Sequence, residues 1–416
     1  MSWVTAHIGD FVEAGSATIQ TGPFGTQLRA SDYVSDGTPV INVRNIGFGD
    51  LRPDKLEFVA ETTKDRLSVH LIRPDDIVFG RKGAVDRHLL ATEEHLDWMQ
   101  GSDCIRLRIG TDKLNPRFIS FAFLRESHKQ WMLAQSGNKA TMASLNQDII
   151  KRIPIPLPSR VVQDAIVEVL SAYDDFIENN RRRMALLEES ARLLYREWFV
   201  WLRFPGHGHT WIVDGVPEGW VHRSLVDTCV SLEDGDWIES KDQGGEDYRL
   251  LQISNIGMNE FVETGNFRYV TEQTFKRLRC REILPGQILI SRMPKPIGRA
   301  WLVTEMPWKM ITAVDGAILI PNPEIADPYF LIHHLNSPEN VESCERRAVG
   351  ATRPRISRRE LASLPVLVPP FTLQRDFREV AEPLNQQRAN LYRQNQKLRA
   401  ARDLLLPRLM SGEIAV

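Results

Sequence analysis

Apolar residues recur at alternating steps of four and three along a long segment in the middle of the chain. The positions between them are mostly charged. The series is Ile166, Leu170, Tyr173, Ile177, Asn180, Met184, Leu187, Ala191, Leu194 and Trp198. This spacing is the heptad seam of a coiled coil, in which a polar residue such as Asn180 can set the register. We therefore predict a long helix that begins after the helix-breaking Pro158.

A second segment near the end of the chain repeats this pattern. Its apolar positions are Phe377, Ala381, Leu384, Leu391, Leu398 and Leu405, and the seam is interrupted by Arg388, Asn395 and Arg402. A helix of about 35 residues is about 50 Å long. Because so long an apolar stripe exceeds that of an ordinary surface helix, we predict that the two helices pack antiparallel as a spacer.

The remaining segments alternate short apolar runs with turn residues. The runs DIVFG and CIRLRI in the first half, and QILIS and GAILI in the second, are typical of strands. Each half also contains one short helical pattern, NPRFISFAFLRES or DPYFLIHHLNSPEN. The pattern predicts an α+β domain of roughly 150 residues in each half.

The two halves match each other at a separation of 211 residues. The matched pairs are Pro154 and Pro365, Pro158 and Pro369, and Gln163 and Gln374. The segments IRPDDIVFGR and INVRNIG match ILPGQILISR and LQISNIG at nearly the same separation. We predict two similar globular domains in a pseudo-twofold arrangement, separated by the two antiparallel helices. The expected segments are 1–150, 151–204 (helical), 205–216 (connector), 217–360 and 361–416 (helical).

Composition adds limits to this picture. The 416 residues are 42% hydrophobic and 25% charged, with a formal net charge of −2, so positive charge for a nucleic-acid partner must be concentrated locally. Cys104, Cys229, Cys280 and Cys344 lie far apart and are expected to be buried, reduced thiols. The sequence lacks the patterns of a signal peptide or a membrane span, so we expect a soluble, cytoplasmic protein.

Motifs for catalysis are missing from the sequence. It contains no phosphate-binding loop, dinucleotide fingerprint, H-E-x-x-H or G-x-S-x-G motif. The triplet Glu239–Lys241 has the acid-x-lysine spacing of a metal nuclease, but the other half of the chain has no counterpart. His207 and His209 have no carboxylate or cysteine at ligand spacing. We therefore predict a binding protein without a metal site.

The stretch TGPFGTQL, from Thr21 to Leu28, places a proline and a phenylalanine between two glycines. Gly22 and Gly25 tolerate a positive φ and Pro23 fixes its own φ, so this loop is predicted to be a tight protrusion. Two interpretations stay open. Either the loop presents something to a partner, or it is a hairpin turn whose Phe24 anchors it to the core.

Together these motifs resemble the specificity subunit of type I restriction-modification enzymes. The resemblance rests on GPFG followed by Y…G.PVI…NI, on DIVFGRKG, and on IPIPLP…Q…I…L leading into a long helix, with the pattern duplicated. It implies two target recognition domains, each reading one half of a split double-stranded DNA site. It also implies helices that set the gap and dock two adenine-methylating modification subunits, which motor-nuclease restriction subunits join. The chain itself would hold no cofactor, because S-adenosylmethionine, ATP and magnesium belong to the partners.

Candidate DNA contacts follow from the resemblance and the duplication. Glycines in the GPFG loop permit backbone approach to phosphate, and Thr26 or Gln27 could contact a base edge or a phosphate. The corresponding SLEDGDWIES departs from the family pattern, because it places acids where phosphate would lie. Basic residues recur at matched positions after a strand and before each proline-containing strand. The full set is Gly22, Phe24, Gly25, Thr26, Gln27, Arg44, Asn45, Arg81, Lys82, Arg87, Lys139, Thr141, Asn255, Arg292, Lys295, Arg299, Arg353 and Arg355.

Two other functions stay open at this point. The chain could be a stand-alone nuclease or methyltransferase with an unrecognised active site, or a scaffold that binds only proteins. Trp198, Phe199 and Trp201 near the end of the first helix fit either a docking surface for modification subunits or core packing against the connector.

Overall fold

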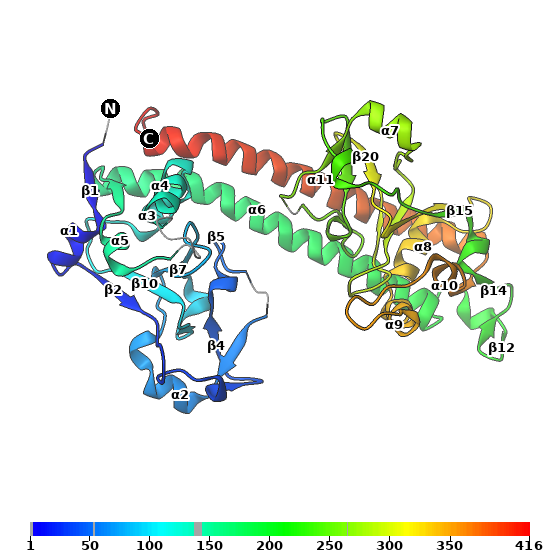
Figure 1. Ribbon diagram of the computed structural model, residues 1–416. Helices are drawn as coiled ribbons and strands as arrows, with labels where there is room; N and C mark the ends of the chain where they lie inside the picture. Colours follow the sequence, from blue (N-terminus) through cyan, green and yellow to red (C-terminus); the bar gives the residue numbers. More distant parts are fainter. Residues whose placement is uncertain (1–2, 53–54, 137–143, 264) are drawn as a thin grey trace. The chain divides into compact units, whose positions relative to one another are not determined.

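The computed structural model describes residues 3–52, 55–136, 144–263 and 265–416. The chain forms two compact units, Met1–Glu178 with Asn395–Val416, and Asn179–Gln394. The units are β-rich and are joined by two long helices, α6 (Arg160–Tyr195) and α11 (Phe371–Met410), each of which contributes to both units (Figure 1). The predicted α+β class and the two long helices are confirmed. The division into five segments stays a prediction.

The first unit contains short strands and short helices before α6. Its strands are β1 (Thr5–His7), β2 (Ala17–Thr21), β3 (Tyr33–Val34), β4 (Thr38–Ile41), β5 (Phe48–Gly49), β6 (Glu57–Val59), β7 (Ile77–Gly80), β8 (His88–Leu90), β9 (Met99–Gln100), β10 (Cys104–Ile109) and β11 (Pro154–Pro156). Its helices are α1 (Ile8–Glu13), α2 (Glu61–Arg66), α3 (Pro116–Leu124), α4 (Glu126–Ser136) and α5 (Gln147–Lys151).

The second unit also contains short strands and short helices. Its strands are β12 (Ile212–Val213), β13 (Val216–Pro217), β14 (Val221–Ser224), β15 (Cys229–Asp234), β16 (Tyr248–Leu251), β17 (Tyr269–Val270), β18 (Ile288–Ser291), β19 (Ala300–Leu302), β20 (Lys309–Thr312), β21 (Gly316–Pro321) and β22 (Pro365–Val368). Its helices are α7 (Glu272–Leu278), α8 (Pro328–Leu335), α9 (Pro338–Arg347) and α10 (Arg358–Ala362).

The two units share the main features of their sheet topology. The main sheet of the first unit has the order β2-β10-β7-β8-β5, and that of the second has β15-β21-β18-β19. A smaller sheet pairs β4 in parallel with β9, as β16 pairs in parallel with β20. The proline-containing strand β11 pairs with β1, as β22 pairs with β14. The repeat seen in the sequence is therefore a repeat of the fold.

In each unit α6 and α11 pack antiparallel along the predicted seam. Asp174 pairs with Arg402 at 2.5 Å, and the Asn395 side chain donates to the Ile177 carbonyl in the same unit. In the second unit, Arg388 pairs with Glu188. The polar residues that interrupt the seam of α11 thus have partners on α6, and burial raises the pKa of both carboxyls, Asp174 and Glu188.

A buried glutamine at the start of each long helix holds the neighbouring loop. Gln163 Oε1 accepts from the Asn115 backbone N–H at 2.8 Å, and its Nε2 donates to the carbonyls of Lys113 and Pro158. Gln374 makes the same three bonds, to the backbone N–H of Asp327 and the carbonyls of Ile325 and Pro369. Both side chains are fully buried. Asn115 and Asp327 cap α3 and α8, so each glutamine fixes a cap against a long helix.

The cysteines and the apolar character of the helices complete the description of the fold. The four cysteines are free, and Cys229 is only half-buried. Within the described part of the chain, none of the helices combines the length and apolar character needed to cross a membrane.

Candidate nucleic-acid interface

Two of the predicted contact segments of the first unit, the GPFG loop and the loop after β7, meet at the ends of strands β2, β7 and β10 in its main sheet. The Gly22 N–H donates to the Cys104 carbonyl at 2.9 Å, and the Arg81 N–H donates to the Asp103 carbonyl at 2.8 Å. The Leu145 N–H donates to the Arg81 carbonyl at 2.7 Å. We call this cluster the first edge, comprising residues 21–29, 81–87, 101–103 and 144–147. Sequence alone could not bring these segments together.

The GPFG loop on the first edge is presented rather than anchored by its phenylalanine. A Cβ on Gly22 would lie 1.9 Å from the Gly101 carbonyl oxygen, so only glycine fits there. Gly25 has a φ of +63°. Phe24 is 62% exposed, whereas Leu28 is buried and anchors the loop. Of the two open interpretations, the structure supports the presented loop.

Polar residues around this loop differ in how accessible they are. Thr26 and Gln27 are exposed, and so is Lys82, which lies 3.7 Å from Asp103. The guanidinium of Arg87 lies over the Phe48 ring at 5.3 Å.

Two further first-unit predictions have different outcomes. Arg44 is exposed and pairs with Glu57 at 2.8 Å. The predicted contacts Lys139 and Thr141 lie outside the described residues.

The second unit forms the same edge with different side chains. The Gly235 N–H donates to the Gly316 carbonyl, and a Cβ on Gly235 would lie 2.3 Å from the Ala313 carbonyl oxygen. The Ile356 N–H donates to the Arg292 carbonyl, which repeats the bond between Leu145 and Arg81. We call this cluster the second edge, comprising residues 234–238, 292–299, 313–315 and 355–359. SLEDGDWIES therefore occupies the place of the GPFG loop despite its acids.

Two predicted contacts of the second unit, Arg292 and Arg299, are buried. Arg299 is 8% exposed and donates to backbone carbonyls, and its acceptors are Ile253, Ile256, Pro294 and Pro296. Arg292 is 3% exposed, donates to the Val314 carbonyl and pairs with Asp234 at 2.9 Å. Burial lowers the pKa of both guanidinium groups. We correct their assignment: both arginines hold loops together and do not reach outward.

Asn45 and Asn255 also have structural roles. Asn45 is fully buried, and its amide accepts from the Asn42 N–H and donates to the Arg52 carbonyl. Asn255 makes the matching bonds to Gln252 and Val262. These amides close a turn after β4 and β16. The matched NIG motif is thus explained by folding, and neither amide is a surface contact.

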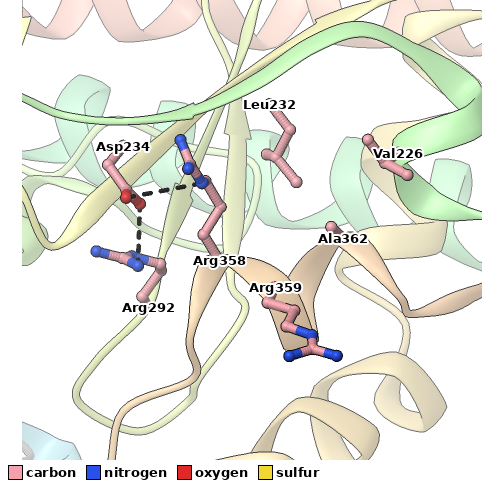
Figure 2. A pocket seen from close by; sticks show the side chains of 7 residues that line it. All are labelled: Val226, Leu232, Asp234, Arg292, Arg358, Arg359 and Ala362. Carbon is pink, nitrogen blue, oxygen red and sulfur yellow. Dashed lines mark ion pairs between the residues drawn. The ribbon is translucent and has the colours of Figure 1, made fainter.

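A cavity of about 540 Å³ opens on the second edge. Figure 2 shows Arg292 and Arg358 converging on Asp234, whereas Arg359 points away from that carboxylate. The lining residues are Val226, Leu232, Asp234, Arg292, Arg358, Arg359 and Ala362. With three arginines and one aspartate, the wall of the cavity carries net positive charge.

The pair that corresponds to Asp234 and Arg358 is uncharged at this corner of the first unit. Thr21 precedes Gly22 as Asp234 precedes Gly235, and Gln147 begins α5 as Arg358 begins α10. The Gln147 amide donates to the Thr21 hydroxyl at 2.9 Å. One scaffold therefore carries a neutral pair in one unit and an ion pair in the other.

Accessible cations remain on and beside the second edge. Lys295 is exposed and pairs with Glu345 at 2.7 Å, and Arg355 pairs with Asp315 at 3.0 Å. Arg353 is exposed two residues before Arg355.

Within the residues that the structure describes, no group of three or more His, Cys, Asp or Glu side chains is arranged to hold a metal ion. Glu239 and Lys241 pair with each other at 2.8 Å.

Comparison with known proteins gives a match to a known family. The family profile described as "Type I restriction modification DNA specificity domain" matches residues 2–189. Residues 2–189 therefore form a DNA specificity domain of the kind found in type I restriction-modification systems.

Two relatives extend the match beyond the first unit. The MjaIX specificity subunit of Methanocaldococcus jannaschii is 24% identical over 318 residues, which covers 74% of this chain and 71% of that protein. The crystal structure of a type I restriction-modification S subunit from M. genitalium has a TM-score of 0.55 and 17% identity. That comparison covers 98% of this chain and 96% of the other, and shows a shared fold.

The aromatic residues near the end of α6 divide between core and surface. Phe199 is buried and contacts the rings of Phe330 and Phe377, and Trp198 packs on Phe377. Trp201 is 44% exposed, with the Arg196 guanidinium over its ring. Core packing thus accounts for Trp198 and Phe199.

Proposed function

We propose that this chain is the non-catalytic specificity subunit of a type I restriction-modification system, and that each of its units reads one half of an asymmetric, bipartite site in double-stranded DNA through its edge. The observation that carries the proposal is that one sheet edge, built by the same backbone bonds in both units, presents unlike side chains. Because the two corners differ in charge, the two half-sites should differ in sequence. Exposed cations beside each edge suit phosphate contacts, which position a protein on the duplex.

We further propose that α6 and α11 set the distance between the half-sites and dock two modification subunits, with restriction subunits joining that core. S-adenosylmethionine, ATP and magnesium would be held by these partners in the cytoplasm. The absence of recognisable catalytic motifs in the sequence supports this division of labour. Turnover of DNA by the purified chain alone, with magnesium or S-adenosylmethionine, would instead support the nuclease or methyltransferase alternative.

Phosphate contacts at the edges predict a salt-dependent loss of binding. Lys82→Ala and Arg353→Ala should each weaken DNA binding by a similar factor on every sequence, and each should reduce the slope of log K against log salt by about 1. The measurement is fluorescence anisotropy of the assembled complex with duplex DNA at several salt concentrations. Lys276→Ala, a change at an exposed lysine of α7 that pairs with Glu272, serves as the control and should leave the slope unchanged. Equal salt slopes in the wild-type protein and all three variants would contradict the proposal.

Lengthening the helices predicts a wider gap. One heptad inserted after Glu178 in α6 and one after Gln394 in α11 keep the seam in phase. These seven residues add about 10 Å to each helix, which corresponds to about three base pairs. Methylation mapping in cells that express this chain with its methyltransferase partner should show unchanged half-sites with a wider gap. Altered half-sites would contradict the spacer role.

A further inference from the structure

Trp237 occupies the same structural position in the second unit as Phe24 in the first. Gly22 and Gly235 make matching backbone bonds and have the same close approach to a carbonyl oxygen. The aromatic residue follows two positions later in both units. Phe24 is 62% exposed and Trp237 is 72% exposed. Two different aromatic residues are thus held outward at equivalent points of two divergent domains.

The backbone beneath each ring is held in place. In the second unit, the Asp236 N–H donates to the Thr312 carbonyl, and its carboxylate accepts from the Arg281 N–H at 3.0 Å. In the first unit, Pro23 is buried directly before Phe24. The Trp237 side chain hydrogen-bonds to the Glu239 carboxylate, which orients the indole and contributes to lowering the pKa of Glu239, after the larger effect of Lys241. These rings are therefore presented on fixed supports.

Positively charged side chains near Phe24 and Trp237 indicate the kind of partner that the two rings contact. Lys82 is exposed in the loop after β7, which belongs to the first edge together with the GPFG loop. Arg358 lines the positively charged cavity at the second edge. A polyanion is held by such cations, whereas an exposed ring gains free energy when it packs against an apolar surface. Duplex DNA offers both within a few ångströms, as phosphates and as base faces or thymine methyl groups.

We propose that Phe24 and Trp237 are base-contacting residues, each packing its ring against the bases of the half-site read by its own unit. This inference rests on the proposed function, because it takes the edges as DNA-binding surfaces. It assigns to the acidic loop of the second unit a contact made by an aromatic ring instead of by Thr or Gln. Phe24→Ala and Trp237→Ala should then act on different half-sites.

The test uses the full chain assembled with its modification subunits and a duplex that carries the methylated site mapped in cells. Two further duplexes carry base changes in one half-site or the other. Phe24→Ala should weaken binding to the intact duplex at least tenfold and abolish discrimination at one half-site only. Trp237→Ala should do the same at the other half-site. Phe24→Trp and Trp237→Phe should retain most of the affinity, because a ring remains.

Matched controls are Phe267→Ala and Trp211→Ala, which remove rings that are 57% and 78% exposed elsewhere. They should leave half-site discrimination unchanged. Wild-type binding by both edge variants would overturn this inference, and a reduced salt slope for Lys82→Ala would then show that the proposed function stands. If Lys82→Ala also binds as wild type at every salt concentration, both proposals fail. Loss of subunit assembly with unchanged DNA affinity per complex would show that the rings contact protein, and would also overturn the inference.

Discussion

Replacing Asp76 with asparagine is expected to lower the free energy of unfolding of the first unit by about 3 kcal/mol. Asp76 is 1% exposed, and its carboxylate pairs with the Arg108 guanidinium through two contacts of 2.7 Å. It also lies 3.8 Å from Arg106, which is 5% exposed, and it accepts from the Arg73 N–H. Without the charge, the buried Arg106 loses its counter-ion, which costs far more than breaking a surface pair.

Hydrogen-exchange mass spectrometry across a denaturant series would measure this loss unit by unit. The matched control is Asp75→Asn, because Asp75 is the exposed neighbour and asparagine tolerates its φ of +68°. The control should be close to wild type. Equal stability of Asp76→Asn and Asp75→Asn would show that the pair does not stabilise the fold.

Replacing either buried glutamine with alanine is expected to cost about 3 kcal/mol in its own unit. Gln163→Ala leaves the Asn115 N–H and the carbonyls of Lys113 and Pro158 without their partner in a buried place. Gln374→Ala removes the matching three bonds in the second unit. Each unsatisfied buried group costs about 1–3 kcal/mol, and water entering the space left by the side chain offsets part of the sum.

The two variants control each other, since each should loosen exchange protection in one unit and spare the other. The controls Gln130→Ala in α4 and Gln386→Ala in α11 change exposed glutamines and should have little effect. If Gln163→Ala lowered protection equally in both units, the bonds described would not be the cause.

The helices and the repeat were predictable from the sequence because their signals are periodic and local. A heptad seam indicates which residues are buried, and Ile166, Leu170, Phe377 and Ala381 are indeed fully buried. The constant separation of Gln163 and Gln374 likewise corresponds to one repeated set of hydrogen bonds. The partners of Arg388 and Arg402 across the helix pair were not predictable, because they depend on the register between segments far apart in the chain.

The contact residues were harder to predict because the type of a residue does not reveal whether its side chain points to solvent or into the fold. Arg292 and Arg299 look like surface charges in the sequence, yet their guanidinium groups satisfy buried carbonyls and a carboxylate. Trp237 was missed because the acids around it suggested that the loop had no equivalent. A signal was present in the glycines, since Gly22 and Gly235 stand 213 residues apart, close to the separation of the other matches.

The polar pairs along α6 and α11 imply that the helix pair cannot slip. Sliding α11 by one heptad would separate Arg388 and Arg402 from Glu188 and Asp174, and loss of the mostly buried Arg388–Glu188 pair alone would cost several kcal/mol. The pairs therefore fix the register between the two helices. During evolution, a change in the length of one helix should be tolerated only when the other helix gains or loses the same number of residues. The distance that the helix pair sets should therefore change by whole heptads and not by single residues.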